Sequence, residues 1–140
     1  MSRVQLALNV SNVDSAVEFY TKLFGVEPAK RKPGYANFAI ADPPLKLVLI
    51  ENAGAQERLN HLGVEVEDQT AVAAHKQRLV GDGLVAATEE GVTCCYAVQD
   101  KVWAVDPDRA PWEFYTVLED AESMGQSSVV GVDQQTCCSS

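Results

Sequence analysis

The chain has 140 residues, of which 46% are hydrophobic and 22% are charged, and this composition is typical of a globular domain. Its 20 acidic and 11 basic residues give a formal net charge of -9, which argues against binding to a nucleic-acid backbone or an anionic membrane. No segment has the pattern of a signal peptide or the roughly 20 apolar residues of a membrane helix. We therefore expect a cytoplasmic protein with no nucleic-acid or membrane partner.

The first half of the chain predicts one helix among four strands. Alternating apolar residues in 4–10 are typical of a half-buried strand, and Asn12 then stands where a helix N-cap is preferred. The amphipathic segment after Asn12 ends at Gly25, where a helix C-cap favours the left-handed conformation. The strands expected after this helix occupy residues 26–32, 35–42 and 44–51.

The second half repeats this order. Residues 60–81 align with residues 4–25 without a gap, so that Asp68 takes the place of the helix cap and Gly81 the place of the helix end. The later strands are expected at residues 84–88, 100–106 and 111–119, with an inserted flexible loop at about 90–100. The repeat predicts an α+β fold in which two βαβββ modules form a mixed-sheet cleft.

The two modules span about residues 3–52 and 58–119 and together form one domain, residues 1–120. Residues 121–140 contain few large apolar side chains and many Ser, Gln and Gly, so we expect a mobile C-terminal tail that carries Cys137 and Cys138.

The repeat also places three potential metal ligands on related strands. Gln5 and His61 occupy equivalent positions on the first strands of the two modules, and Glu113 lies on the last strand of the second. If a pseudo-two-fold axis relates the modules, these side chains meet near it. An imidazole, a carboxylate and an amide oxygen suit Fe(II), Mn(II) or a related divalent ion, and strands hold such ligands rigidly. We expect the site to be lined or supported by the apolar neighbours Leu6, Leu62, Trp112 and Phe114.

Each of these residues also has a purely structural interpretation. A single strand histidine is more often a hydrogen-bonded core residue than a ligand, and Glu113 alone resembles an edge-strand carboxylate. The amide of Gln5 can equally be satisfied by backbone groups. The presence of all three at related positions favours the metal site. His75 in the second helix has no such partners and is interpreted as structural.

Two longer stretches resemble a known family. SNVDSAVEFYTKLFG after the first strand and VDPDRAPWEFY near the end are similar to the vicinal oxygen chelate superfamily, which includes glyoxalase I, bleomycin- and fosfomycin-resistance proteins and extradiol dioxygenases. The resemblance covers about residues 3–119. Within the superfamily, the stretches TCCY and NHLG are similar to the organoarsenical carbon–arsenic lyases and their cadmium-induced relatives.

The resemblance implies a mononuclear metal centre with Gln5, His61 and Glu113 as protein ligands and Fe(II) as the cofactor, for which other divalent metals can substitute. Many dioxygenase-type members have histidine in place of Gln5, whereas some glyoxalase I enzymes use glutamine. Lys46 occupies the position where glyoxalase I has a fourth ligand, usually glutamate. A lysine there favours a three-ligand site that stays open to substrate and dioxygen.

The four cysteines form two adjacent pairs, Cys94 with Cys95 and Cys137 with Cys138. Neighbouring cysteines bridge only through a strained ring, and a reducing cytoplasm keeps thiols free, so we expect free thiol pairs. A trivalent arsenical with one organic group has two exchangeable bonds, which two soft thiolates can fill. Cys94 and Cys95 are therefore predicted to bind the substrate, and the alternative is that they are inert buried residues. Cys137 and Cys138 either gather or deliver arsenic or have no role.

The resemblance implies a non-haem Fe(II)-dependent dioxygenase, a C–As lyase that converts methylarsenite and aromatic arsenicals to inorganic As(III). Its partners are then a trivalent organoarsenical and dioxygen, and it acts as a monomer or homodimer. Tyr96 and Lys101 are candidates for proton donors or loop anchors. The alternatives are a non-catalytic thiol-based protein that sequesters cadmium or As(III), and a thiol-transferring resistance enzyme.

Overall fold

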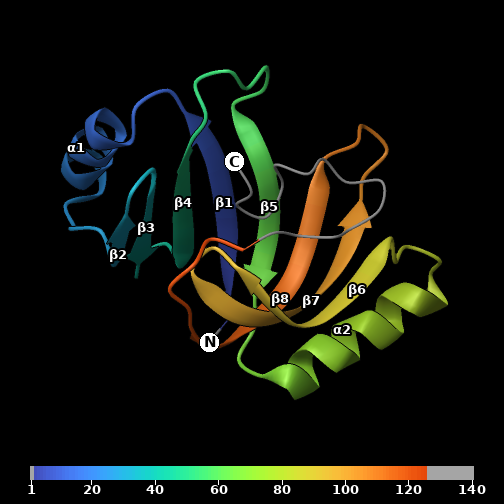
Figure 1. Cartoon of the computed structure of the whole chain (residues 1–140). Helices are drawn as coiled ribbons and strands as arrows, with labels where there is room; N and C mark the ends of the chain where they lie inside the picture. The colour runs from blue at the N-terminus through green and yellow to red at the C-terminus, as the bar shows by residue number, and fades with distance from the viewer. Residues whose placement is uncertain (1, 126–140) are drawn as a thin grey trace.

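The structure is a computed structural model that describes residues 2–125. Each half of this range contributes four strands and one helix in the same order (Figure 1). The first half consists of β1 (Arg3–Val10), α1 (Val13–Phe24), β2 (Lys30–Lys32), β3 (Tyr35–Ile40) and β4 (Leu45–Glu51). The second half consists of β5 (Leu59–Glu65), α2 (Gln69–Gly81), β6 (Ala87–Cys94), β7 (Ala97–Val105) and β8 (Pro111–Asp120).

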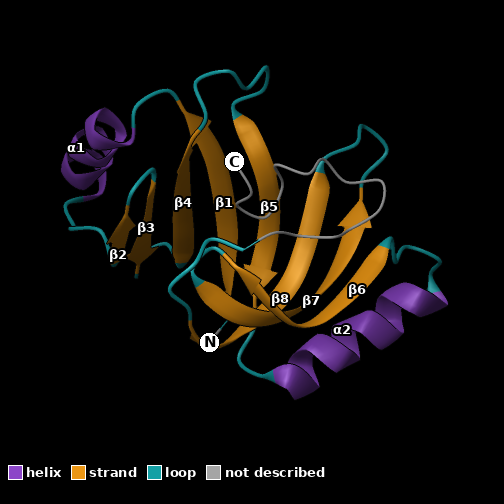
Figure 2. Cartoon of the chain, in the orientation of Figure 1, coloured by secondary structure: helices purple, strands orange, loops and turns teal. Residues whose placement is uncertain are grey.

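The described strands form one eight-stranded mixed sheet in the order β2-β3-β4-β1-β5-β8-β7-β6. β1 pairs with β4, and β5 with β8, in parallel, whereas β1 and β5 pair antiparallel at the centre. The order is therefore symmetric about the β1–β5 pair, as a two-fold relation between the modules requires. The sheet curls, and α1 and α2 lie outside it at opposite ends (Figure 2). The predicted α+β mixed-sheet fold is confirmed.

The two faces of the sheet pack against different partners. In β1, β3 and β4, one set of alternating side chains packs with α1 and comprises Leu6, Leu8, Ala36, Phe38, Leu47 and Leu49. The intervening side chains point to the concave face, where a second core cluster contains Ala7, Tyr35, Val48, Ile50 and Trp103. Because Trp103 belongs to β7, the concave face is the surface on which the two modules meet.

Both helices begin at their predicted caps. The side-chain oxygens of Asn12 and Asp68 each accept a backbone N–H of the following turn at 2.9 Å. Gly25 ends α1 in the left-handed conformation with φ 69°, as predicted. α2 ends at Gly81, but the residue with left-handed φ of 70° is Gly83. Within the part of the chain that the structure describes, no helix combines the length and apolarity that a membrane crossing needs.

The segment expected to be a flexible loop at about 90–100 is instead the tip of a β-hairpin. β6 ends at Cys94 and β7 begins at Ala97, so Cys95 and Tyr96 alone form the turn. Both turn residues have positive φ, 52° and 59°, as the favoured two-residue hairpin turns require. The sequence lacks the Asn-Gly or Asp-Gly pair that usually marks such a turn, and the expectation of a loop was wrong for that reason.

Residues 121–125 run beside this hairpin tip. Ala121 N donates to Tyr96 O at 2.8 Å, and Cys95 N donates to Met124 O at 2.9 Å. Cys137 and Cys138 of the predicted tail lie outside the described residues.

Replacing Asn12 with Ala removes the side-chain acceptor at the start of α1. We expect the free energy of unfolding to fall by about 1 kcal/mol, which lowers the melting temperature by about 4 °C in a domain of this size. Asn12→Asp keeps an accepting oxygen and serves as the control, so thermal unfolding should leave it within about 0.5 kcal/mol of the parent. Equal melting temperatures for the Ala and Asp variants would contradict the capping role.

Candidate metal centre

Gln5, His61 and Glu113 converge on the concave face of the sheet. They lie on β1, β5 and β8, the central strands, and their exposed fractions are 3%, 0% and 2%. Gln5 Nε2 lies 3.0 Å from His61 Nε2 and 2.8 Å from Glu113 Oε2. His61 Nε2 lies 2.5 Å from Glu113 Oε2. The structure therefore brings the three predicted ligands together.

Gly63 provides the space in which these side chains meet. In the sheet register Gly63 is the partner of Gln5 on one side and of Glu113 on the other. A Cβ atom at Gly63 would lie 2.8 Å from Glu113 Cγ, 3.0 Å from Glu113 O and 3.3 Å from Gln5 Nε2. The absent side chain of β5 is thus what lets the amide and the carboxylate approach each other across that strand.

Asn60 orients the imidazole of His61. The register between β1 and β5 shifts beyond the Ala7–His61 pair, which makes Asn60 an extra residue in β5. The Asn60 Oδ1 atom lies 2.8 Å from His61 Nδ1, and Asn60 Nδ2 donates to Asn9 Oδ1 at 3.0 Å. Because an amide oxygen only accepts, this contact places a proton on Nδ1 and directs Nε2 at Gln5 and Glu113.

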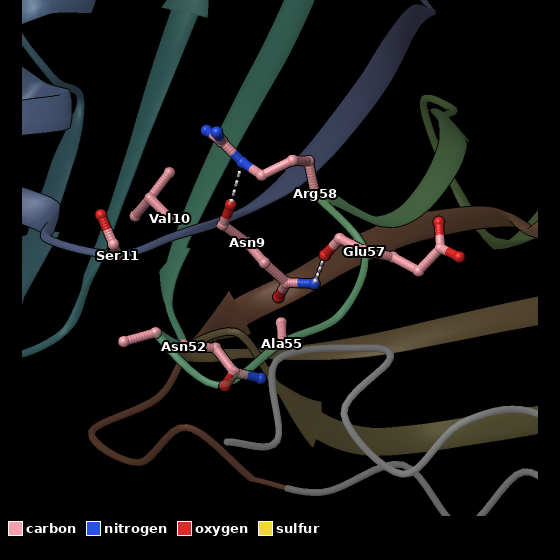
Figure 3. A pocket seen from close by; sticks show the side chains of 8 residues that line it. Asn9, Val10, Ser11, Asn52, Ala55, Glu57 and Arg58 are labelled. Carbon is pink, nitrogen blue, oxygen red and sulfur yellow. Dashed lines mark hydrogen bonds between the residues drawn. The ribbon is translucent and has the colours of Figure 1, made fainter.

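Asn9 connects this arrangement to the segment that joins the two modules. Its side-chain nitrogen donates to Glu57 O at 3.0 Å, and Arg58 Nε donates to Asn9 O at 3.0 Å (Figure 3). These residues line a small pocket together with Val10, Ser11, Asn52, Ala53 and Ala55. The joining segment is therefore hydrogen-bonded to the strand that carries Gln5.

Lys101 balances the charge of Glu113. Its Nζ atom lies 2.9 Å from Glu113 Oε1, and Lys101 is 1% exposed. Burial raises the pKa of Glu113, but the charges of Lys101 and His61 outweigh burial and hold the pKa well below its usual range. The carboxylate is therefore ionised, and Lys101, a sequence candidate for proton transfer, lies inside the centre.

The three donors fit a divalent metal ion. Ligand atoms at about 2.1 Å from an ion and at right angles to one another are about 3 Å apart. The separations among Gln5 Nε2, His61 Nε2 and Glu113 Oε2 lie between 2.5 and 3.0 Å, so the space fits an ion once the oxygen of the Gln5 amide takes the place of its nitrogen. The amide is needed to complete the set, because residues 2–125 contain no three His, Cys, Asp or Glu side chains grouped to hold an ion.

Glu65 organises the neighbouring row of side chains. The register aligns Arg3, Glu65 and Tyr115 across β1, β5 and β8. Arg3 donates to Glu65 Oε1 at 3.0 Å, and Lys46 Nζ lies 3.5 Å from the same oxygen. Burial raises the pKa of Glu65, but Lys46 and Arg3 outweigh it and the net shift is downward. Lys46 therefore pairs with Glu65 and contributes no ligand.

Cys94 and Cys95 lie against the same concave face. Their exposed fractions are 0% and 9%, and they pack in the core cluster with Ala7 and Trp103. Ala7 is the sheet partner of His61, and the rings of Trp103 and His61 are 5.5 Å apart. The cysteine pair and the candidate ligands therefore share neighbours.

The expectation of free thiols at Cys94 and Cys95 is wrong for this structure. Both cysteines are disulfide-bonded. Their own sulfur atoms lie 3.8 Å apart, far beyond the S–S bond length of about 2.05 Å, so they are not bonded to each other. Binding of an arsenical by this pair therefore requires prior reduction.

The apolar residues expected to line the site face away from it. Leu6 packs with α1. Leu62 is opposite Leu6 in the sheet, and Trp112 is opposite Leu62, so all three side chains lie on the helix-covered face. Phe114 stacks on His75 of α2 with ring centroids 4.5 Å apart. These residues therefore do not line the site, because the odd-numbered candidate ligands and their even-numbered neighbours point to opposite faces of a strand. That they support the site from the other face stays a prediction.

The chain belongs to the Glyoxalase/Bleomycin resistance protein/Dioxygenase superfamily, whose family model matches residues 3–114. It is 62% identical over 125 residues to the cadmium-induced protein CadI of Mycobacterium bovis, covering 89% of this chain and 82% of that protein. It is 54% identical over 139 residues to the trivalent organoarsenical cleaving enzyme of Thermomonospora curvata, covering 99% and 89%. These relatives confirm the family expected from the sequence.

The fold likeness extends to more distant members. The crystal structure of the Mn(II)-bound glyoxalase from Novosphingobium aromaticivorans matches with a TM-score of 0.61 at 19% identity, covering 88% of this chain and 42% of that chain. A catechol 2,3-dioxygenase structure matches with a TM-score of 0.55 at 16% identity, covering 86% of this chain and 42% of that chain. These two matches show that the fold is shared with a glyoxalase and a dioxygenase.

Three residues that the sequence pattern did not assign belong to the centre: Asn60, Gly63 and Tyr115. Asn60 and Gly63 flank His61 in the NHLG stretch, and a glycine within a strand pattern is itself a signal of close backbone approach. Tyr115 had no comparable signal, because a buried strand tyrosine is ordinary core composition.

Replacing Gly63 with Ala should displace Glu113 and Gln5, because the new Cβ atom meets Glu113 backbone as well as its side chain. We expect a loss of about 1–3 kcal/mol in the free energy of unfolding, with a parallel loss of divalent-metal affinity. Gly54→Ala is the control, since the nearest atom to its Cβ is 4.0 Å away. Chemical denaturation and metal titration that leave the two variants alike would contradict this role of Gly63.

Proposed function

We propose that the protein is a non-haem Fe(II)-dependent dioxygenase that cleaves the carbon–arsenic bond of trivalent organoarsenicals and releases inorganic As(III). The observation that carries the proposal is the convergence of Gln5, His61 and Glu113 beside the buried pair Cys94 and Cys95. The 54% identity to a trivalent organoarsenical cleaving enzyme supports this substrate class.

The amide oxygen of Gln5, His61 Nε2 and the Glu113 carboxylate would hold the metal ion. Bound Fe(II) would supply the activation of dioxygen, which does not react with the arsenical unaided. Three protein ligands leave coordination positions free. Lys46 supports that arrangement, because its ammonium pairs with Glu65 where a fourth ligand would otherwise stand. Lys101 keeps the Glu113 carboxylate ionised and thus able to bind the ion.

Cys94 and Cys95, once reduced, would hold the arsenical. Two thiolates replace the two exchangeable oxygen ligands of trivalent arsenic and leave the organic group attached. The hairpin tip that carries them is fixed by contacts from the first module: Lys30 donates to Tyr96 O at 3.0 Å, and the rings of Tyr35 and Tyr96 are 5.2 Å apart. Tyr96 accordingly acts as an anchor of the hairpin. These contacts hold the arsenical on the same face as the metal ligands.

The overall reaction needs no external reductant. For methylarsonous acid, one dioxygen gives formaldehyde and arsenous acid with all atoms balanced. The methyl carbon loses four electrons, dioxygen gains four, and arsenic stays trivalent. For the thiol-bound substrate, two water molecules also enter: they supply the oxygen atoms of arsenous acid that the thiolates had replaced, and they return both cysteines as thiols.

Aerobic incubation of the reduced, Fe(II)-loaded protein with methylarsenite should consume oxygen and release inorganic As(III), measured by chromatography with elemental detection. His61→Ala should abolish release, because it removes a candidate ligand and a buried hydrogen-bonding partner of Glu113. His75→Ala, which alters the other histidine of the chain, is the matched control and should keep turnover. The absence of oxygen-dependent release from the loaded parent protein would reject the proposal.

A second candidate function is non-catalytic sequestration of cadmium or As(III) by thiols. It is favoured by the 62% identity to a cadmium-induced protein. Two variants distinguish these functions. A binding protein keeps its whole activity in His61→Ala and loses it in Cys94→Ser. A lyase loses turnover in both variants and keeps arsenical capture in His61→Ala.

Arsenical capture should depend on the redox state of the protein. Because Cys94 and Cys95 are disulfide-bonded, the untreated oxidised protein should bind no methylarsenite, and protein reduced with a phosphine should bind one equivalent. Native mass spectrometry measures both. With Cys137 and Cys138 both replaced by Ser, the further change Cys94→Ser should abolish binding after reduction, because the one remaining thiolate cannot fill both positions on arsenic. One equivalent bound by the oxidised protein would contradict a role for this pair.

A further inference from the structure

The orientation of the Gln5 amide is set by a buried hydroxyl. Tyr115 OH donates to Gln5 Oε1 at 2.5 Å, and Tyr115 is 0% exposed. On its other end the amide donates from Nε2 to Glu113 Oε2 at 2.8 Å. Both ends of the amide are therefore occupied, the oxygen by the tyrosine and the nitrogen by the carboxylate.

This orientation cannot bind a metal ion. The amide nitrogen is a donor without an available lone pair, and only the oxygen ligates a cation. The oxygen now points at Tyr115, away from His61 and Glu113. Without a cation the orientation is also the stable one, because a turned amide would set its oxygen against the Glu113 carboxylate.

Glu65 is a second hydrogen-bond acceptor for the Tyr115 hydroxyl. Glu65 Oε1 lies 3.3 Å from Tyr115 OH, farther than Gln5 but within reach. Arg3 and Lys46 lie 3.0 and 3.5 Å from the same oxygen and keep Glu65 ionised. A hydroxyl has one proton and two lone pairs, so Tyr115 can donate to Glu65 while it accepts from an amide nitrogen.

We propose that Tyr115 is a positioning residue for metal binding: its hydroxyl proton turns from Gln5 to Glu65 as the Gln5 amide rotates to present its oxygen to the ion. The inference rests on the proposed metal centre. In the turned arrangement every group keeps a partner, since Gln5 Nε2 donates to the tyrosine oxygen and the tyrosine donates to a carboxylate. That last hydrogen bond is charge-assisted, so it favours the ligating orientation.

Tyr115→Phe removes this alternative partner. The turned amide then leaves its nitrogen buried and unpaired, and the bond to Glu65 is lost. Hydrogen-bonding partners that orient a metal ligand typically contribute about 10–100-fold to metal affinity, and we expect a loss in that range for Mn(II), measured by competition with a chelator. Mn(II) is chosen because it prefers oxygen and nitrogen donors over thiolates.

Tyr35→Phe is the matched control. Tyr35 is also 0% exposed on the concave face, but its hydroxyl contacts Asn37 and not the centre. The Mn(II) affinity of Tyr35→Phe should stay within about threefold of the parent, well below the loss expected for Tyr115→Phe. Equal affinities for the parent and Tyr115→Phe would overturn this inference alone, whereas a parent protein that binds no Mn(II) would overturn the metal centre as well.

A measurement on the unaltered protein tests the rotation directly. With Zn(II) added to the disulfide form, the nuclear Overhauser contact between the Gln5 amide protons and the Tyr115 ring protons should strengthen, and the amide nitrogen shift should move. An amide nitrogen whose contacts stay unchanged when Zn(II) binds would overturn the proposal, even if Tyr115→Phe failed to fold.

Discussion

The structure depends on one buried carboxylate and the cations that balance it. Glu113 has lost nearly all contact with water, and His61 and Lys101 lie 2.5 and 2.9 Å from it, on the strands to either side. A buried charge that loses its partner costs several kcal/mol, so β5, β7 and β8 have to meet at this point for the sheet to be stable. Glu113 and His61 are also candidate metal ligands, so the contacts that stabilise the buried carboxylate also fix the candidate ligand geometry. Stability and ligand geometry therefore arise from one arrangement.

The duplication of the βαβββ module explains where the candidate ligands lie. The differences between the two modules explain why they form a single candidate metal centre. The antiparallel β1–β5 pair sets Gln5 opposite Gly63 and Ala7 opposite His61, so each long polar side chain faces a small residue. On the outer strands the copies differ. β8 supplies a carboxylate that faces this space, whereas β4 supplies Lys46, whose ammonium pairs with Glu65. A second acidic residue at that position would add a buried negative charge, and the lysine instead holds Glu65 ionised.

Local pattern was enough to predict the helices, their N-caps and the strands of the sheet centre, because alternation and capping depend on neighbouring residues. The convergence of Gln5 with His61 was also predictable, since the repeat carries the symmetry. What could not be predicted depends on tertiary contact. The pattern gives no sign that Tyr115 reaches both Gln5 and Glu65, because either face of a buried strand accepts a tyrosine. The turn at Cys95 was missed since its backbone conformation is imposed by contacts with distant residues.

The turn at Cys95 and Tyr96 adopts a backbone conformation that its residue types do not favour. Positive φ costs a non-glycine residue about 1 kcal/mol or more, and Cys95 and Tyr96 both adopt it. Lys30 and Ala121 each donate a hydrogen bond to Tyr96 O, which offsets this cost with contacts from opposite ends of the chain. A glycine would relieve the strain but would remove a sulfur atom from the hairpin tip. A flexible loop would spare the strain as well, but it would lose the fixed position over Ala7 and Trp103. The presence of Cys95 in this strained turn, directly after the buried Cys94, is therefore better explained by a need for two sulfur atoms beside the candidate ligands, as a disulfide or as thiols, than by packing.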